Sequence, residues 1–249
     1  MTKTTLAAML GSVALATSAI ATTIDISEYN AAAFGTATSD LGNLSTTGFE
    51  REGTLLGEGE ITPGGALTTA VGDFETIGGT GNGGTVGQIA GNTGTNVALR
   101  DGNVYGRTNT TAGGAYFLDS NDTHGIRWTA SNGGSIFDTL VFTLMDASEF
   151  SFLRVIADGV TKEQRVGGRL SDGNTSLVEI SLGTAVASLT VELANFSSFG
   201  GSTNQRNDGF SIDDATLGLA PVPVPASLPL LALGAGVFGY LRRQKRKAS

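Results

Sequence analysis

The chain offers few side chains that could carry out covalent chemistry. Its 249 residues contain one histidine, His124, and no cysteine, beside 23 Asp and Glu residues. Thiol chemistry is therefore excluded, and a zinc site, which usually takes several His or Cys ligands, is not expected. A Ser–His–acid triad would have to use His124, but no GxSxG motif accompanies it. A carboxylate pair could serve a glycosidase, but no pair stands out. We predict that the protein is not an enzyme.

Aromatic side chains form a second possible site, because sugar rings stack on exposed aromatic faces. The candidates are Tyr105, Tyr116, Phe117 and Trp128. A β-domain buries most of its aromatic residues in the core, where they contribute large apolar areas. Core packing is therefore our prediction for Trp128, and sugar binding remains the alternative for this group.

Residues 77–106 are the most Gly-rich stretch and contain Gly79, Gly81 and Gly84 at the spacing of a dinucleotide-binding loop. Such a loop needs a strand before it and a helix after it, so that the helix N-terminus faces the pyrophosphate. The sequence predicts neither element here. We interpret the stretch as a loop, or as edge strands with glycine at the turns.

The elements that position any site are predicted to be strands. The chain has 37 glycines and 15% charged residues, and short alternating apolar runs lie between Gly, Asn and Asp turns. This pattern is typical of a β-sandwich or jelly roll. We predict an all-β fold, a single jelly-roll-like antiparallel β-sandwich over residues 46–219. The strand candidates are residues 114–120, 125–130, 135–146, 149–158, 176–183, 187–193 and 209–219.

Two details of this prediction concern connections. The short turn at 146–148 predicts an antiparallel hairpin between residues 135–146 and 149–158. Residues 22–45 are expected to form a loose lead-in to the sandwich, with one short helix over residues 28–34.

Two segments near the ends of this region carry a resemblance. Residues 46–52 (TTGFERE) and 209–217 (GFSIDDATL) resemble the first and last strand signatures of extracellular jelly-roll domains, including carbohydrate-binding modules and MAM-like domains. In those folds the terminal strands lie side by side, and an acid from each can hold a structural Ca²⁺, which prefers six to eight oxygen ligands. The resemblance implies that Glu50, Asp213 and Asp214 are calcium ligands.

The alternation of side chains along a strand limits this site. In an uninterrupted strand Asp213 and Asp214 point to opposite faces, so at most one of them reaches an inward site. We expect that one to be Asp214, on the face of Phe210 and Ile212. The alternative is that both are solvated at a local bulge.

The first 21 residues have the parts of a secretory signal peptide. Lys3 precedes an apolar stretch from Leu6 to about Ile20, and Ala19 and Ala21 form a small-x-small cleavage pattern. The apolar stretch is short for a transmembrane helix, which needs about 20 residues. We predict cleavage near Ala21 and export of the chain.

The charges of the chain are unevenly distributed. Of the 15 Lys and Arg residues, one precedes residue 22 and five follow residue 221, so the nine between them face all 23 acids and the body has a net charge of −14. A body of this charge should repel nucleic acid and anionic lipid, which both need a basic surface. We therefore expect no nucleic-acid partner.

The C-terminal region has three parts. A proline-punctuated motif is followed by 15 uncharged residues, 227–241, and then by a basic cluster. At 1.5 Å per residue the uncharged run spans roughly 22 Å as a helix, which is short for a hydrocarbon core of about 30 Å. Basic residues stay in the cytoplasm, so the body would face outward. The motif is Val222, Pro223, Val224, Pro225, Ala226 and Ser227, and the basic cluster is Arg242, Arg243, Lys245, Arg246 and Lys247.

This order of motif, apolar helix and basic end resembles the PEP-CTERM class of sorting signals, and its VPLPA variant in particular, which has Leu where this chain has Val224. The resemblance covers about 28 residues and implies a Gram-negative bacterium that makes exopolysaccharide. It also implies that an exosortase, an integral-membrane enzyme, recognises the motif at the inner membrane and releases or transfers the protein to the cell surface. An ordinary single-span anchor is the alternative.

We therefore expect an exported structural or interaction protein of the cell surface or extracellular matrix. A carbohydrate-binding module that holds matrix exopolysaccharide is the first alternative, and a surface hydrolase is the second.

Overall fold

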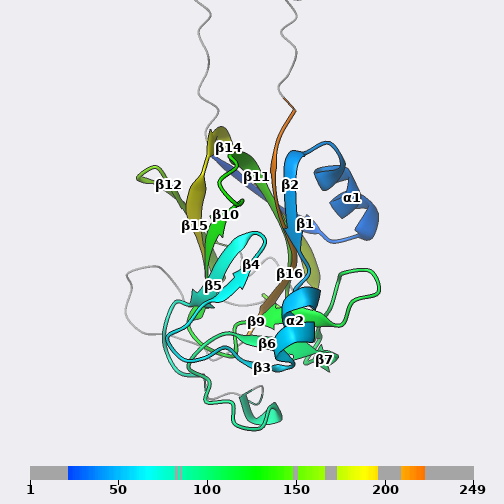
Figure 1. Cartoon of the computed structure of the whole chain (residues 1–249), viewed down its shortest axis with the longest axis vertical. Coiled ribbons are helices and arrows are strands. Elements are labelled where there is room, and N and C mark those ends of the chain that lie inside the picture. Colours follow the sequence, from blue (N-terminus) through cyan, green and yellow to red (C-terminus); the bar gives the residue numbers. More distant parts are fainter. Residues whose placement is uncertain are drawn as a thin grey trace, which may run out of the picture.

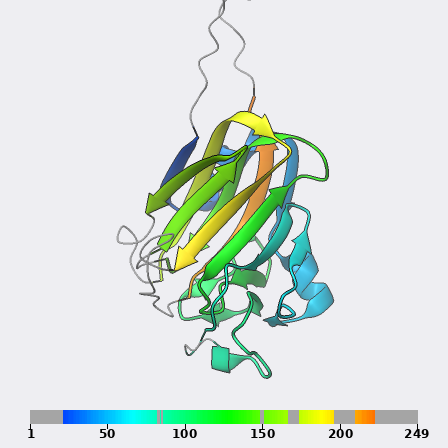
Figure 2. The same cartoon turned by 90° about the vertical axis from the view of Figure 1, so that its left-hand side faces the viewer.

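The computed structural model describes residues 22–81, 84, 86–147, 151–165, 173–195 and 209–221. Within these residues the chain is mostly β-structure with two α-helices, and every strand pair is antiparallel. The predicted all-β class is confirmed. Two sheets lie face to face with the hydrophobic core between them (Figures 1 and 2).

In the larger sheet, β16 pairs with β11 on one side. On its other side it pairs with two strands in turn, β9 and β2. In spatial order the path of this sheet is β1 (Thr23–Glu28), β14 (Thr175–Val186), β11 (Phe137–Met145), β16 (Ser211–Leu219), β9 (Tyr116–Asp119), β6 (Ala98–Asp101) and β3 (Gly59–Glu60), and β2 (Gly42–Thr47) also pairs with β16.

The smaller sheet supplies the opposite face of the core. In spatial order it contains β13 (Val160–Arg165), β12 (Ser151–Ala157), β15 (Ser188–Asn195), β10 (Gly125–Ser131), β5 (Gly72–Thr76) and β4 (Leu67–Thr69). The remaining elements are the ribbon of β7 (Asn103–Val104) and β8 (Arg107–Thr108), the 3₁₀ turn η1 (Val86–Gln88), and the helices α1 (Ala31–Ser39) and α2 (Glu50–Leu56).

The core forms because alternate residues of both sheets face one another. Trp128 in β10 is fully buried, stacks on Phe74 with ring centroids 5.2 Å apart, and meets the edge of Phe142 in β11 at 6.0 Å. Its indole N–H donates to the Val71 carbonyl at 2.9 Å, which satisfies the one polar atom that burial would otherwise leave unpaired. Core packing of Trp128 is therefore confirmed.

The prediction of a loose lead-in over residues 22–45 is wrong. β1 forms the edge of the larger sheet, in register with β14 from Thr23 to Glu28, and β2 pairs with β16. The helix begins later than expected, because the Asn30 side chain caps α1 by accepting from the backbone N–H of Ala33 at 2.8 Å. The sandwich therefore begins at about residue 23.

The predicted hairpin across residues 146–148 is also wrong. β11 lies between β14 and β16 in the larger sheet, whereas β12 lies between β13 and β15 in the smaller one. The chain therefore crosses from one sheet to the other after β11. Two adjacent alternating runs predict two strands, but they do not reveal whether those strands share a sheet.

Candidate functional site

The three acids that the sequence singled out come together at β16. This strand pairs with β9 through its first two residues and with β2 from Ala215 onward. Asp213 and Asp214 lie between these two pairings, where β2 and β9 diverge. Glu50 begins α2 shortly after β2 ends, so the pairing of β2 with β16 brings it to the same region.

Asn109 links these acids. Its side-chain amide donates to Glu50 Oε1 at 2.8 Å and to Asp213 Oδ2 at 3.1 Å. Glu50 Oε1 also accepts the backbone N–H groups of Ala115 and Tyr116, at 2.8 and 2.9 Å. We call the group of Glu50, Asn109, Asp213 and Asp214 the Asp213 cluster.

The prediction that Asp213 and Asp214 point to opposite faces is wrong. The register between β11 and β16 shifts between Val141 and Thr143, and Asp214 has a left-handed φ of 50°. A bulge of this kind adds a residue to one strand and re-aims its side chains. Both carboxylates therefore reach Thr110, whose hydroxyl oxygen lies within hydrogen-bond distance of Asp213 Oδ2 at 3.1 Å and of Asp214 Oδ2 at 2.9 Å.

The segment after β8 supplies further donors to the two aspartates. The backbone N–H groups of Thr110 and Thr111 donate to Asp213 Oδ2 at 2.7 and 3.2 Å, and the Thr111 hydroxyl donates to Asp214 Oδ1 at 2.6 Å. The bulge considered as an alternative is present, but neither side chain is solvated, since Asp213 is 0% and Asp214 8% exposed. The two aspartates are therefore buried, whereas Glu50 and Asn109 are only partly so.

Its charge balance is unusual. Among the described residues, no ion pair connects a Lys or Arg to Glu50, Asp213 or Asp214. Burial, and then the charge of Asp214, raise the pKa of Asp213 from 3.8 to about 7, although backbone N–H groups act in the opposite direction. At neutral pH the pair is therefore poised to take up a proton or a cation.

Tyr29 also belongs to this neighbourhood, and sequence reasoning missed it because it falls in the supposed lead-in. Its hydroxyl lies 3.5 Å from the Thr110 carbonyl. Burial, followed by the charges of Asp214 and Asp213, raises its pKa, so the phenol stays protonated.

The chemistry of the Asp213 cluster suits Ca²⁺ better than its present geometry does. Carboxylate, amide and hydroxyl oxygens are the ligands that Ca²⁺ accepts. Yet no three Asp, Glu or His side chains in the described ranges converge as a ready-made metal site. The Asn109 amide stands between Glu50 and Asp213, so an ion shared by both would require Asn109 to turn its amide oxygen inward.

A second buried group of carboxylates, which the sequence did not reveal, surrounds an arginine. Arg107 Nη1 lies 2.9 Å from Asp119 Oδ2 and 4.0 Å from Asp122 Oδ1, and Arg107 Nε lies 3.6 Å from Asp146 Oδ2. Each of these side chains is at most 10% exposed. We call these four residues the Arg107 cluster.

The outer face of the smaller sheet carries a row of alternating charges. Arg127 in β10 pairs with Glu75 at 3.2 Å and with Glu192 at 3.0 Å, and Glu192 also contacts Arg154, which pairs with Glu163 at 3.6 Å. The five residues lie directly opposite one another across five strands. Phe152, two residues before Arg154 in β12, lies on the same face and is half-buried.

The other residues considered at the sequence level are dispersed. Phe117 is fully buried, Tyr116 is half-buried and packs against Gly53, and Tyr105, in the turn between β7 and β8, is 61% exposed. His124 lies beside the backbone of Gly79, where any side chain would collide with the imidazole. The loop after Gly79 leads into a three-residue 3₁₀ turn, so it lacks the helix that a dinucleotide site needs.

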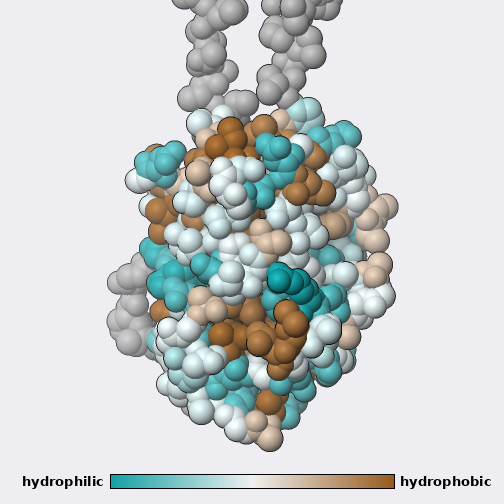
Figure 3. All heavy atoms as spheres, in the orientation of Figure 1, coloured by the Kyte–Doolittle hydropathy of each residue, from teal (hydrophilic) through white to brown (hydrophobic). Residues whose placement is uncertain are grey.

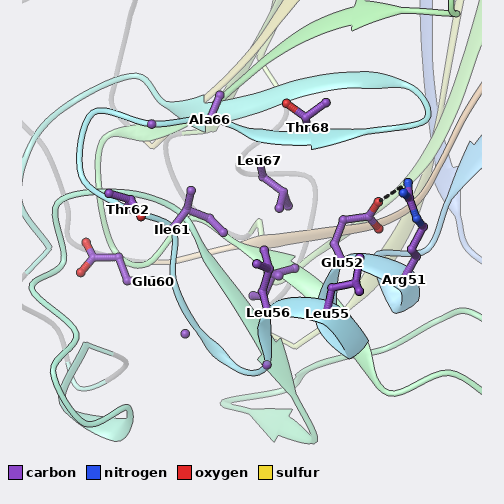
Figure 4. Close-up of a pocket in the computed structure, with 14 residues that line it drawn as sticks. Arg51, Glu52, Leu55, Leu56, Glu60, Ile61, Thr62, Ala66, Leu67 and Thr68 are labelled. Carbon is purple, nitrogen blue, oxygen red and sulfur yellow. Dashed lines mark ion pairs between the residues drawn. The ribbon is translucent and has the colours of Figure 1, made fainter.

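A cavity of about 530 Å³ lies between α2 and the segment from β3 to β4 (Figure 4). Leu55, Leu56, Ile61 and Leu67 line it, and Glu52 and Glu60 flank it. Burial alone would raise the pKa of Glu60, but hydrogen bonds from the loop at Thr93 to Asn96 lower it. Glu60 therefore anchors that loop as an ionised acceptor.

Both terminal predictions fall outside the described residues. These are the cleavage residues Ala19 and Ala21, the motif from Val222 to Ser227 and the basic cluster from Arg242 to Lys247. In the described part of the chain, no helix has the length and apolar character needed to cross a membrane. No protein-family model matches the chain, and no curated protein matches it in sequence.

Proposed function

We propose that this protein is an exported structural or interaction component of the cell surface or extracellular matrix. An exosortase would receive it at the inner membrane through the tail and process it there. The body would be one jelly-roll-like sandwich, and its role would depend on the surfaces it presents rather than on covalent chemistry.

One observation carries the proposal, namely the order of the three C-terminal parts. The motif at 222–227 is followed directly by an uncharged run that is marginal as a permanent membrane span, and then by a basic end that stops transfer. Such a span suits a temporary stop in the membrane before cleavage.

The body supports this proposal over sugar binding and hydrolysis. Trp128 and Phe117 are buried, and a row of ion pairs crosses the outer face of the smaller sheet. The 530 Å³ cavity is lined largely by apolar side chains, among them Leu55, Leu56 and Ile61. Support for a matrix role therefore comes from the tail, together with a β-sandwich whose core is packed with apolar side chains.

We further propose that the Asp213 cluster holds a structural Ca²⁺. Glu50, Asn109, Asp213 and Asp214 would supply the protein oxygens, with carbonyl groups of the segment at Thr110. The ion would tie β16, α2 and the loop after β8 together by neutralising carboxylates that have no basic partner among the described residues. It would stabilise the fold and take no part in catalysis.

The experiment is to express the full chain in an exopolysaccharide-producing Gram-negative host with and without its exosortase. We expect the body outside the cell only when the exosortase is present, and a membrane-bound chain of full length when it is absent. The variant Pro223→Ala, Pro225→Ala should behave as if the enzyme were absent, whereas Pro229→Ala, which lies beyond the motif, should be released normally. Release that is unaffected by loss of the enzyme would contradict the proposal.

A further inference from the structure

The first and last described strands reach the same end of the sandwich. Thr23 in β1 pairs with Ser181 in β14, Ser181 pairs with Thr139 in β11, and Thr139 pairs with Gly218 in β16. These four residues form one row across the sheet, so Thr23 and Gly218 lie three strand spacings, or about 14 Å, apart. We call this the exit end of the sandwich, because Thr22 and Pro221 both lie there (Figure 1).

The loops at the exit end expose apolar side chains. Leu44 at the start of β2 is 54% exposed, Ile136 before β11 is 48% exposed, and Val160 after the β12–β13 turn is 65% exposed. The strands β2, β11 and β13 all begin at this end. For β2, Gly42 pairs with Leu219 near the end of β16. For β13, the turn before Val160 follows the part of β12 that lies at the exit end. Figure 3 shows apolar residues gathered at this end and, separately, around the cavity beside α2.

Two of these three residues lie beside the point where the chain leaves the sandwich. The Asn132 side chain, in the loop that carries Ile136, donates to the Asn43 carbonyl next to Leu44 at 2.5 Å. Asp138, two residues beyond Ile136, accepts the backbone N–H of Ala220 at 2.7 Å. These hydrogen bonds hold the loops that carry Leu44 and Ile136 close to the point where the chain leaves β16.

The connection between this end and the uncharged run is short. Only residues 222–226 separate Pro221 from the start of that run at Ser227, and five extended residues span at most about 18 Å. With the run in a bilayer, the exit end would stay within that distance of the lipid surface, where a tether gives even a weak contact a high effective concentration.

We propose that the exit end docks on the bilayer surface while the tail is in the membrane, with Leu44, Ile136 and Val160 in contact with lipid. This rests on the proposed function, since it requires the run at 227–241 to insert. The contact would be mainly apolar, because the charged residues near these loops include Asp40, Asp138 and Asp158 together with one exposed base, Lys162, and acids do not attract anionic lipid. The body would therefore be oriented with the Asp213 cluster away from the membrane. Cleavage at the motif would release the body from the bilayer.

The natural absence of cysteine allows a clean test. Single-cysteine variants of the full chain, Leu44→Cys, Ile136→Cys and Val160→Cys, would each be labelled with an environment-sensitive fluorophore. They would be reconstituted into vesicles of phosphatidylethanolamine and phosphatidylglycerol that contain a lipid-borne quencher. Leu55→Cys, at a 70% exposed apolar residue in α2, and Tyr105→Cys are matched controls away from the exit end. Gly236→Cys reports on insertion of the tail.

We expect quenching of the probes at residues 44, 136 and 160 to be at least threefold stronger than at residues 55 and 105, together with strong quenching at residue 236. Quenching at residue 236 with all five body probes equally unquenched would overturn the docking proposal and leave the proposed function standing. Equal quenching of all body probes would also overturn it, as nonspecific adsorption. No quenching at residue 236 would overturn both proposals.

Discussion

Two groups of buried carboxylates in this sandwich differ in how their charge is balanced. In the Arg107 cluster a buried guanidinium lies among three aspartates, at 2.9 to 4.0 Å. In the Asp213 cluster the carboxylates accept hydrogen bonds from uncharged hydroxyl and amide groups. No ion pair within the described ranges reaches these acids. The first group carries its own cation, whereas the second depends on a proton or a cation from solution.

The largest effect should come from removing the internal cation. Arg107→Met would leave buried aspartates without their guanidinium, so we expect a loss of about 3–5 kcal/mol in the free energy of unfolding, or failure to fold. Arg107→Lys, which retains the charge but not the fork of donors, should lose less. Denaturant unfolding monitored through Trp128 measures both, and a loss below about 1 kcal/mol for Arg107→Met would contradict the interpretation of this cluster.

The next effect should come from supplying the external cation. If Ca²⁺ is present at 100 times its dissociation constant, binding to the folded state alone adds about 2.7 kcal/mol of stability, which raises Tm by roughly 5–10 °C. Chelation should remove this gain from the wild-type protein and from Asp119→Asn in the Arg107 cluster. Asp213→Asn and Asp214→Asn should show no gain at all.

A wild-type melting curve that is the same in calcium and in chelator would rule out the calcium site. A gain that survives in Asp213→Asn would place the ion elsewhere in the chain.

A third effect concerns protons in the calcium-free protein. Because the pKa of Asp213 is raised from 3.8 to about 7 by burial and by Asp214, the folded state holds a proton between these values that the unfolded state has lost. The stability due to this group is therefore fully present below pH 3.8 and is lost as the pH rises through about 7. Tm measured between about pH 5 and pH 8 should fall more in the wild type than in Asp213→Asn, and parallel curves would contradict this assignment.

The smallest effect should come from the exposed ion pairs of the smaller sheet. Glu163, whose side chain is 45% exposed, pairs with Arg154 at 3.6 Å. Exposed pairs contribute about 0–1 kcal/mol, so Glu163→Gln should change the free energy of unfolding by less than about 1 kcal/mol, and less still at high salt. A larger loss would show that the row of charges acts as one network rather than as separate pairs.

Local pattern predicted the strands but not their partners. The apolar runs at residues 187–193 and 209–219 correspond to β15 and β16, although β16 is buried on both faces along nearly its whole length. The jump between sheets after β11 depends on packing across the whole core, which no local pattern contains. The lead-in was misjudged because β1 is an edge strand whose polar outer residues look like those of a loop.

The candidate site, like the strands, could be predicted only in part. The resemblance at residues 46–52 and 209–217 pointed to Glu50, Asp213 and Asp214, and pairing of β2 with β16 places them in one region. The bulge at Asp214 was only the alternative at the sequence level, because it arises where β16 changes partners between β9 and β2, which the sequence does not reveal. Asn109, Tyr29 and Arg107 reach their clusters through contacts across 30 or more positions or through loop conformation, so their spacing in the sequence gave no signal.

The most direct test of the account is the mass of the extracellular form made by the native host. The account predicts a C-terminus between Val222 and Ser227, with the uncharged run and the basic cluster absent and the N-terminus near Thr22. An extracellular or membrane-bound product that still ends at Ser249, in cells with an active exosortase, would contradict it and would make the tail a permanent anchor.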